Sequence, residues 1–185
     1  GRNFRLLAIP YIEYMFVDES VQCQNISSSD ASKYLDRRFC NFIYSANIAR
    51  DEGHSVRNEF CKQLMKYKNV DCPGKVLNNM SDDELPPRYS KNEFSGKLNY
   101  LKKYKFTIAF EGTSEYSYTT ERLMQALLAH TIPIYWGNPL VYKDYNTQAF
   151  INCNDYENMD EVIEEVIRLD QDNDAYMNMI MQPPM

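Results

Sequence analysis

Four polar side chains lie near the beginnings of two expected helices. Arg57 and Arg122 are each expected in the first turn of a helix, where free backbone N–H groups and the positive end of the helix dipole attract anions. Two guanidiniums there can hold a diphosphate and stabilise it as it departs. The Glu121 carboxylate can accept hydrogen bonds from ribose hydroxyls, and Tyr118 can stack or donate from its phenol. The alternative for each residue is a surface charge or a packed ring, since polar loops are common.

Two strand–helix units would position these side chains. Residues 38–45 are a short β-prone run, and residues 55–67 follow with apolar side chains at helical spacing and Ser55 as a candidate N-cap. Residues 104–110 form the strongest strand, and a helix is expected from about Thr120. The polar segment between that strand and that helix is therefore a strand-to-helix loop.

The rest of the chain continues this alternation. Short strands are expected near residue 70, at residues 131–137 and at residues 148–153, and an amphipathic helix at residues 159–169. Such alternation predicts an α/β fold, a mainly parallel sheet with flanking helices. Ligands of such sheets bind beyond the carboxyl ends of the strands, which is where the polar loop lies. Residues 81–90, rich in Asp and Pro, are expected to form an exposed loop.

Length and charge restrict the possible functions. At 185 residues with 44% hydrophobic residues, the chain suits one folded domain or one half of a larger enzyme. A net charge of -6 gives no basic surface of the kind that binds nucleic acid. The absence of G-x-G-x-x-G and G-x-x-x-x-G-K motifs argues against a dinucleotide dehydrogenase and a P-loop enzyme. No apolar run reaches the ~18 residues that a membrane-spanning helix needs.

Charged runs and cysteines have structural interpretations. Four lysines lie together without an acid, and residues 155–174 are rich in Asp and Glu, so we expect two solvated faces. Five widely spaced cysteines without a C-x-x-C pair suit neither a zinc site nor a disulfide framework. We expect free, mostly buried thiols in a reducing compartment, and neither a metal nor a cofactor. The lysines are Lys97, Lys102, Lys103 and Lys105, and the cysteines are Cys23, Cys40, Cys61, Cys72 and Cys153.

The central motif resembles a known family. The stretch "YKFTIAFEGTSEYSYTTERLMQALLAHTIPIYWGNP" is similar to the signature of the α-1,3/4-fucosyltransferases, in which a strand ending in Phe-Glu-Asn leads to Tyr-x-Thr-Glu-Lys and then to an apolar strand closing in Gly. Upstream, "RFCNFIYS", "SVRNEFCKQLMKY" and "VDCPGKVLNN" resemble another block of the family, and "KDYNTQAFIN" and "AYMNMI" resemble a downstream one. The similarity covers about residues 38–180 in the family's order.

This resemblance implies a fold and an activity. The activity is the inverting transfer of fucose from GDP-fucose to a hydroxyl of an N-acetylglucosamine or glucose unit of a glycan acceptor. The fold is GT-B, whose C-terminal Rossmann-like half binds the donor. Residues 1–36 would then be the end of the N-terminal acceptor half and a linker, and residues 37–185 the GDP-fucose-binding domain.

The resemblance also implies roles for five residues. Arg57 and Arg122 look like the basic positions that hold the diphosphate, and Glu121 resembles the acidic residue at the nucleotide ribose. Tyr118 resembles the aromatic residue just before them, and Ser45 matches a serine near the donor. Two positions depart from the pattern. The family usually has Lys at the position of Arg122 and Asn at that of Gly112, and both differences are expected to alter donor affinity.

The family's general base, a carboxylate that deprotonates the acceptor hydroxyl, is expected in the N-terminal half. We therefore expect this chain alone to bind GDP-fucose without transferring fucose efficiently. Two other hypotheses remain: a non-catalytic nucleotide-sugar-binding module, which Gly112 and Arg122 favour, and a glycosyltransferase with another donor. The acceptor glycan, the linkage and the oligomeric state stay open. The location would be the cytoplasm or the membrane periphery in a bacterium, or the Golgi lumen if an upstream anchor exists.

Overall fold

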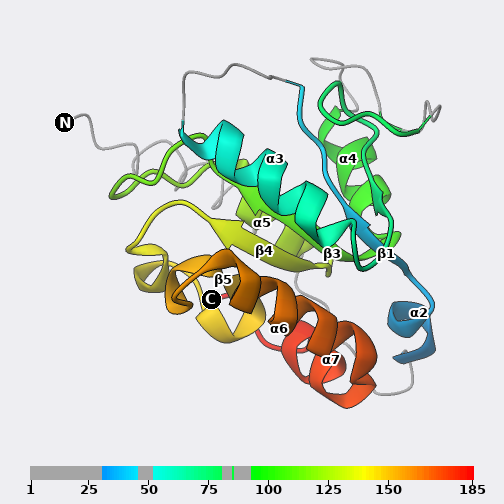
Figure 1. The fold of residues 1–185 in the computed structure, drawn as a ribbon. Helices are drawn as coiled ribbons and strands as arrows, with labels where there is room; N and C mark the ends of the chain where they lie inside the picture. The colour runs from blue at the N-terminus through cyan, green and yellow to red at the C-terminus, as the bar shows by residue number, and fades with distance from the viewer. Residues whose placement is uncertain (1–30, 46–51, 81–84, 86–92) are drawn as a thin grey trace.

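The fold is built on a five-stranded parallel sheet (Figure 1). The computed structural model describes residues 31–45, 52–80, 85 and 93–185. Every pair of neighbouring strands is parallel, and the predicted α/β class is thereby confirmed. In spatial order the strands are β2 (Val70–Asp71), β1 (Arg38–Asn41), β3 (Tyr104–Phe110), β4 (Ile132–Trp136) and β5 (Ile151–Asn152).

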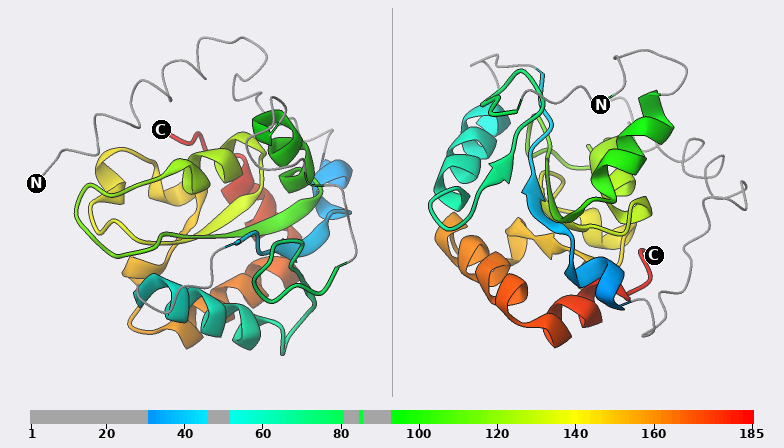
Figure 2. Two further views of the ribbon diagram at one scale, coloured as in Figure 1. Left: turned by 90° about the horizontal axis from the view of Figure 1, so that it is seen from above. Right: turned by 90° about the vertical axis from the view of Figure 1, so that its right-hand side faces the viewer.

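Helices cover both faces of the sheet. Figure 2 shows the sheet between two helical layers, with α3 and α6 on one face and α4 and α5 on the other. α7 packs against α6, and the short α2 packs against α7. The bounds are α2 (Ala31–Leu35), α3 (Glu52–Leu64), α4 (Glu93–Leu101), α5 (Glu121–Leu128), α6 (Met159–Gln171) and α7 (Asn173–Ile180). Among the helices that the structure describes, none is long and apolar enough to cross a membrane.

The central strand β3 anchors the sheet edge that carries the polar loop. All seven of its residues are buried, because helices lie on both of its faces. On one face, Phe60 of α3 packs on Phe110 with ring centroids 5.0 Å apart. On the other face, Leu123 of α5 packs in a cluster with Ala109 and Tyr135. The ends of β3, α3 and α5 are therefore held in one rigid arrangement.

The first helix differs from its prediction at its start. α3 already includes Glu52, so Ser55 lies inside the helix and is not its N-cap. Arg57 consequently falls in the second turn, and its predicted place in the first turn was wrong. The reason is a close approach: Gly53 donates its N–H to the Gly112 carbonyl at 3.2 Å. A Cβ at Gly53 would lie 2.4 Å from the Glu111 carbonyl oxygen, so the helix needs a glycine at this position. In a sequence, a glycine argues against a helix at that point.

Most other elements match their predictions. β3, β4, α5 and α6 occupy the expected segments, whereas the strand expected over residues 148–153 is only Ile151–Asn152 and follows a 3₁₀ turn, Thr147–Ala149. The predicted strand over residues 38–45 ends at Asn41. Helices α4 and α7 were not predicted. The predicted loop at residues 81–90 lies outside the described residues except for residue 85.

The two charged runs are not simply solvated faces. Lys105 is buried in β3, and its Nζ lies 3.3 Å from Oδ1 of the buried Asp170 in α6. Lys68 reaches Oδ2 of the same carboxylate at 2.9 Å, and Tyr67 donates to that oxygen at 2.9 Å. The prediction was wrong at Lys105 and Asp170 because a charge in a central strand must be paired to be buried. Lys102 and Lys103 are exposed, as predicted.

The described cysteines and the first described residues are both packed into the fold. The four described cysteines are free and buried, which confirms that prediction for them, and Cys23 lies outside the described residues. Arg37 donates to the backbone carbonyl of His130, and the Tyr176 hydroxyl donates to the Tyr34 carbonyl at 3.5 Å. These contacts join residues 31–37 to the sheet and α7. A domain boundary near residue 36 stays a prediction.

Candidate functional site

The polar loop at residues 111–120 connects the carboxyl end of β3 to α5 and is bound to the loop that follows β4. Oδ1 of Asn138 accepts hydrogen bonds from the Ser117 N–H at 3.0 Å and the Leu140 N–H at 2.9 Å. Its Nδ2 donates to Thr119 Oγ1 at 3.1 Å, and the Ser114 hydroxyl donates to the Gly137 carbonyl. The loop is thus held by the residues that follow β4, at the sheet edge where ligands of parallel sheets bind.

Glu111, the first residue after β3, lies at the centre of this edge. Its carboxylate has no exposed surface. Oε1 accepts from the Thr120 N–H at 2.8 Å, and Oε2 accepts from the Thr120 hydroxyl at 2.7 Å and from Arg122 Nη1 at 2.8 Å. Burial raises the pKa of Glu111, although Arg122 and Thr120 act in the opposite direction. A Cβ at Gly137 would lie 2.5 Å from Cγ of Glu111, so a glycine there leaves room for the carboxylate side chain.

The two predicted arginines meet at one tyrosine ring. The guanidinium carbon of Arg57 lies 4.1 Å from the centroid of the Tyr44 ring, and that of Arg122 lies 5.7 Å from it. Arg57 is 2% exposed, and the side chain of Arg122 is 30% exposed. The face of an aromatic ring attracts cations, so Tyr44 helps to hold the two guanidiniums near one another.

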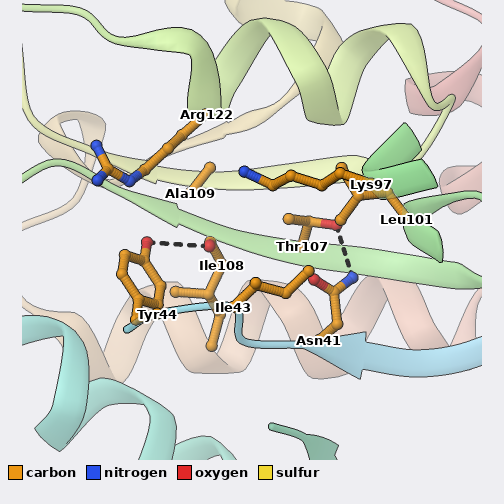
Figure 3. A pocket seen from close by; sticks show the side chains of 9 residues that line it. All are labelled: Asn41, Ile43, Tyr44, Lys97, Leu101, Thr107, Ile108, Ala109 and Arg122. Atoms are coloured by element: carbon orange, nitrogen blue, oxygen red, sulfur yellow. Dashed lines mark hydrogen bonds between the residues drawn. The ribbon is translucent and has the colours of Figure 1, made fainter. Parts of the chain in front are cut away.

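Tyr44 is fixed by the backbone of β3. Its hydroxyl accepts from the Phe110 N–H at 2.7 Å and lies 2.9 Å from the Phe110 carbonyl and 3.1 Å from that of Ile108 (Figure 3). Burial raises the pKa of Tyr44, so the phenol remains neutral at physiological pH. The ring is therefore a rigid support for the two cations.

The start of α5 lacks a side-chain cap. Thr120 occupies the N-cap position, but its side chain makes no capping hydrogen bond because Glu111 and Arg122 engage the hydroxyl. Arg122 lies in the first turn, as predicted. The first-turn N–H groups and the positive end of the helix dipole, with two arginines nearby, form an arrangement suited to phosphate oxygens.

The remaining predicted residues lie around this point. Glu121 is exposed and directly precedes Arg122 on α5. Tyr118 is partly exposed in the loop, where its N–H donates to the Glu115 carbonyl at 3.2 Å. Ser45 is exposed and directly follows Tyr44. The assignment of ribose and sugar contacts to these three residues stays a prediction.

Sequence reasoning assigned no role to Glu111, Tyr44 or Asn138. For Glu111 a signal existed, because a carboxylate directly after the most apolar strand lies at the sheet edge and is close to the buried interior. Tyr44 carried no comparable signal, since nothing local shows that its ring would meet side chains from two helices. Asn138 was visible only as part of a Gly-Asn-Pro turn.

A small cavity lies between this edge and α4 (Figure 3). Its volume is about 20 Å³, and Asn41, Lys97, Thr107 and Arg122 are among its lining residues. Such a volume holds roughly one water molecule. A cavity of this size is too small for a nucleotide.

Comparisons with known proteins agree with this geometry. The family model "Glycosyltransferase family 10 (fucosyltransferase) C-term" matches residues 17–180. An α-(1,3)-fucosyltransferase of Helicobacter pylori is 36% identical over 157 residues, which cover 85% of this chain and 30% of that protein. The GDP-fucose protein O-fucosyltransferase 3 of Bos taurus is 30% identical over 127 residues, which cover 66% of this chain and 26% of that protein.

A solved structure has the same fold. The crystal structure of an α1,3-fucosyltransferase with GDP-fucose superposes with a TM-score of 0.71 at 35% sequence identity, covering 85% of this chain and 42% of that one. The chain thus spans less than half of each of these relatives, and the predicted Rossmann-like part of a GT-B fold is confirmed over that span. The matched residues include both strand–helix units and the polar loop between β3 and α5, and the chain belongs to glycosyltransferase family 10, the fucosyltransferases.

Proposed function

We propose that this chain is the donor-binding part of a fucosyltransferase that uses GDP-fucose. The observation that carries the proposal is the meeting of Arg57 and Arg122, from two different helices, at Tyr44 beside the uncapped start of α5. A related structure at 35% identity was determined with GDP-fucose, which supports this donor over other nucleotide sugars.

The two arginines would stabilise the departing nucleotide. In an inverting transfer, the acceptor oxygen forms a bond to the anomeric carbon of fucose from the face opposite the nucleotide, and the bond from that carbon to the diphosphate oxygen breaks. The bonding electrons leave with GDP, whose developing negative charge the guanidiniums of Arg57 and Arg122 would neutralise. The acceptor proton passes to a carboxylate base, which we place outside this chain. Glu121 would hold the ribose, with Tyr118 and Ser45 beside the donor.

The proposed acceptor is a hydroxyl of an N-acetylglucosamine or glucose unit of a glycan. The Helicobacter pylori relative, an α-(1,3)-fucosyltransferase, supports this class and aligns with 85% of the chain. The likeness to a protein O-fucosyltransferase favours a second candidate, the hydroxyl of a Ser or Thr side chain in a protein. Transfer assays with N-acetyllactosamine and with a folded protein acceptor separate the two.

Calorimetry tests donor binding directly. We expect the chain to bind GDP and GDP-fucose, and to bind UDP-linked sugars at least about tenfold more weakly, because a protein site built for one base leaves polar groups unpaired with another. Absence of GDP binding would refute the proposal. Binding without transfer, even by a longer form that includes the acceptor half, would identify a non-catalytic module. Fast transfer by this chain alone would refute our placement of the base.

A further inference from the structure

We propose that Glu111 is the positioning residue of the donor site, which orients Arg122 and keeps the start of α5 open for the diphosphate. The inference rests on the proposed function, because it concerns the same site. Glu111 does not touch the donor in this scheme and acts through Arg122 and Thr120.

The carboxylate of Glu111 is enclosed by a small set of contacts. Arg122 Nη1 lies 2.8 Å from Oε2 of Glu111 and 2.8 Å from the Thr120 hydroxyl oxygen, and that hydroxyl lies 2.7 Å from the same Oε2. Three groups therefore meet in a triangle. Because the carboxylate has no exposed surface, its charge is compensated inside this triangle and not by solvent. One edge of the Arg122 guanidinium is thereby fixed.

Arg122 carries hydrogen-bond donors beyond those that contact Glu111 and Thr120. A guanidinium carries five N–H groups, and only Nη1 is engaged among the described residues. Nε and Nη2 have no hydrogen-bond partner within the described part of the chain, and the side chain is 30% exposed. An arginine can thus hold Glu111 with one nitrogen and an anion with the others, which a single lysine ammonium cannot do in the same fork geometry.

The hydroxyl of Thr120 does not make the usual N-cap hydrogen bond. A threonine at the N-cap normally accepts from an N–H of the first turn. Here the Thr120 hydroxyl donates to Glu111 and accepts from Arg122, and it makes no capping bond. Glu111 therefore diverts the Thr120 hydroxyl from the first-turn N–H groups of α5, which lack a cap from this side chain.

The test compares Glu111→Gln with a matched control. The amide oxygen of glutamine can still accept from the Thr120 N–H, but the negative charge that holds Arg122 is lost. The control is Asp170→Asn, which removes another buried and paired carboxylate about 20 Å away, beside the opposite end of β3. Calorimetry would use GDP and inorganic pyrophosphate as probes, and the melting temperature of each variant would be measured in parallel.

We expect Glu111→Gln to weaken binding of GDP and pyrophosphate by about tenfold each, because a charge-assisted hydrogen bond that positions Arg122 is lost. Asp170→Asn should lower the melting temperature and leave both affinities unchanged. The loss of affinity should also depend on Arg122. In an Arg122→Lys background, Glu111→Gln should lower the logarithm of each binding constant by less than half as much as it does in the wild type.

Other results would overturn the inference in distinguishable ways. If Glu111→Gln binds both probes like the wild type while Arg122→Ala does not, the positioning role is wrong and the proposed donor site stands. The same conclusion follows if the effects of Glu111→Gln and Arg122→Lys are fully additive. If the wild-type chain binds neither probe, the proposed function and this inference both fail.

Discussion

Two buried carboxylates beside opposite ends of β3 have contrasting surroundings. Asp170, near the amino end, is approached by Lys68, Lys105 and the Tyr67 hydroxyl. Burial alone would raise the pKa of Asp170, but the lysines and the tyrosine together lower it. Glu111, at the carboxyl end, is approached by Arg122 and Thr120 among the described residues, and burial prevails, so its pKa is raised. The number of charged partners decides which effect wins.

The two clusters differ in whether they lie where a ligand could use their remaining hydrogen-bond donors. The Asp170 cluster has more than enough cations for its carboxylate and lies at the sheet edge away from the polar loop. In the described part of the chain, the Glu111 cluster holds Arg122, whose Nε and Nη2 make no hydrogen bond there, and it lies at the edge where parallel sheets bind ligands. We interpret the first cluster as structural and the second as part of the proposed donor site.

Arg122→Ala should have the largest effect. Among the described residues, Arg122 is the cation that pairs with Glu111, and removing it leaves a buried carboxylate with Thr120 alone, which should lower the free energy of unfolding by about 3 kcal/mol at neutral pH. Urea denaturation would measure this loss. Part of it should be recovered in acid, where Glu111 is protonated. An unchanged unfolding midpoint at neutral pH would show that Arg122 does not compensate the buried charge of Glu111.

Gly137→Ala should have the next largest effect. A methyl group there would lie 2.5 Å from Cγ of Glu111, so the carboxylate or the loop must move, at a cost of about 2 kcal/mol. Gly112→Ala is the matched control, because a Cβ there meets no described atom within 4 Å. Thermal unfolding of both variants checks this, and equal melting temperatures would argue against a tightly packed Glu111.

The pH dependence of donor binding should be smaller. As pH falls, Glu111 is protonated above the usual range of a glutamate and loses its hold on Arg122, so GDP-fucose affinity should fall by up to about tenfold. GDP-fucose is a diphosphate diester and does not titrate in the weakly acid range. The phenols of Tyr44, Tyr135 and Tyr145, which face Glu111, stay neutral because burial raises their pKa values. Calorimetry at several pH values should show an acid limb that is absent in Glu111→Gln.

The stability of the two clusters should respond to pH with opposite signs. Since the pKa of Glu111 is raised on folding, the folded state binds more protons there, and this group's contribution to stability falls as pH rises through that window. Since the pKa of Asp170 is lowered, its contribution is present above the usual pKa of an aspartate and is lost as pH falls through the lowered value. The difference in melting temperature between the wild type and each variant, Glu111→Gln or Asp170→Asn, measured at several pH values, gives the pH dependence of each group's contribution.

Arg168→Ala should have the smallest effect and gives the baseline for the comparison. Arg168 pairs with Glu165 one turn earlier on α6 at 2.7 Å, but its side chain is 53% exposed. Solvent-exposed pairs contribute little, so the free energy of unfolding should change by less than about 0.5 kcal/mol. A loss comparable to that of Arg122→Ala would mean that burial does not distinguish these ion pairs.

Much of the fold could be predicted because its signals are local. The apolar run of β3 and the helical spacing of Leu123, Leu127 and Leu128 in α5 lie within single segments. The start of α3 could not be predicted in the same way. It depends on the approach of Gly53 to Gly112, two residues far apart in the sequence. Arg122 was placed correctly in its first turn, whereas Arg57 was placed one turn too early for the same reason.

The amino-acid sequence alone was enough to predict the parallel α/β order, the position of the polar loop after β3 and the resemblance to fucosyltransferases, because periodicity and motif spacing are properties of neighbouring residues. The folded structure was needed to show that Arg57 and Arg122 share Tyr44, that Lys105 meets Asp170, and that Glu111 is buried against Arg122. Most of these contacts join different strands and helices. Excluding water from these charges costs free energy unless they are paired, and which charges are buried together depends on how the helices pack on the sheet and not on local sequence.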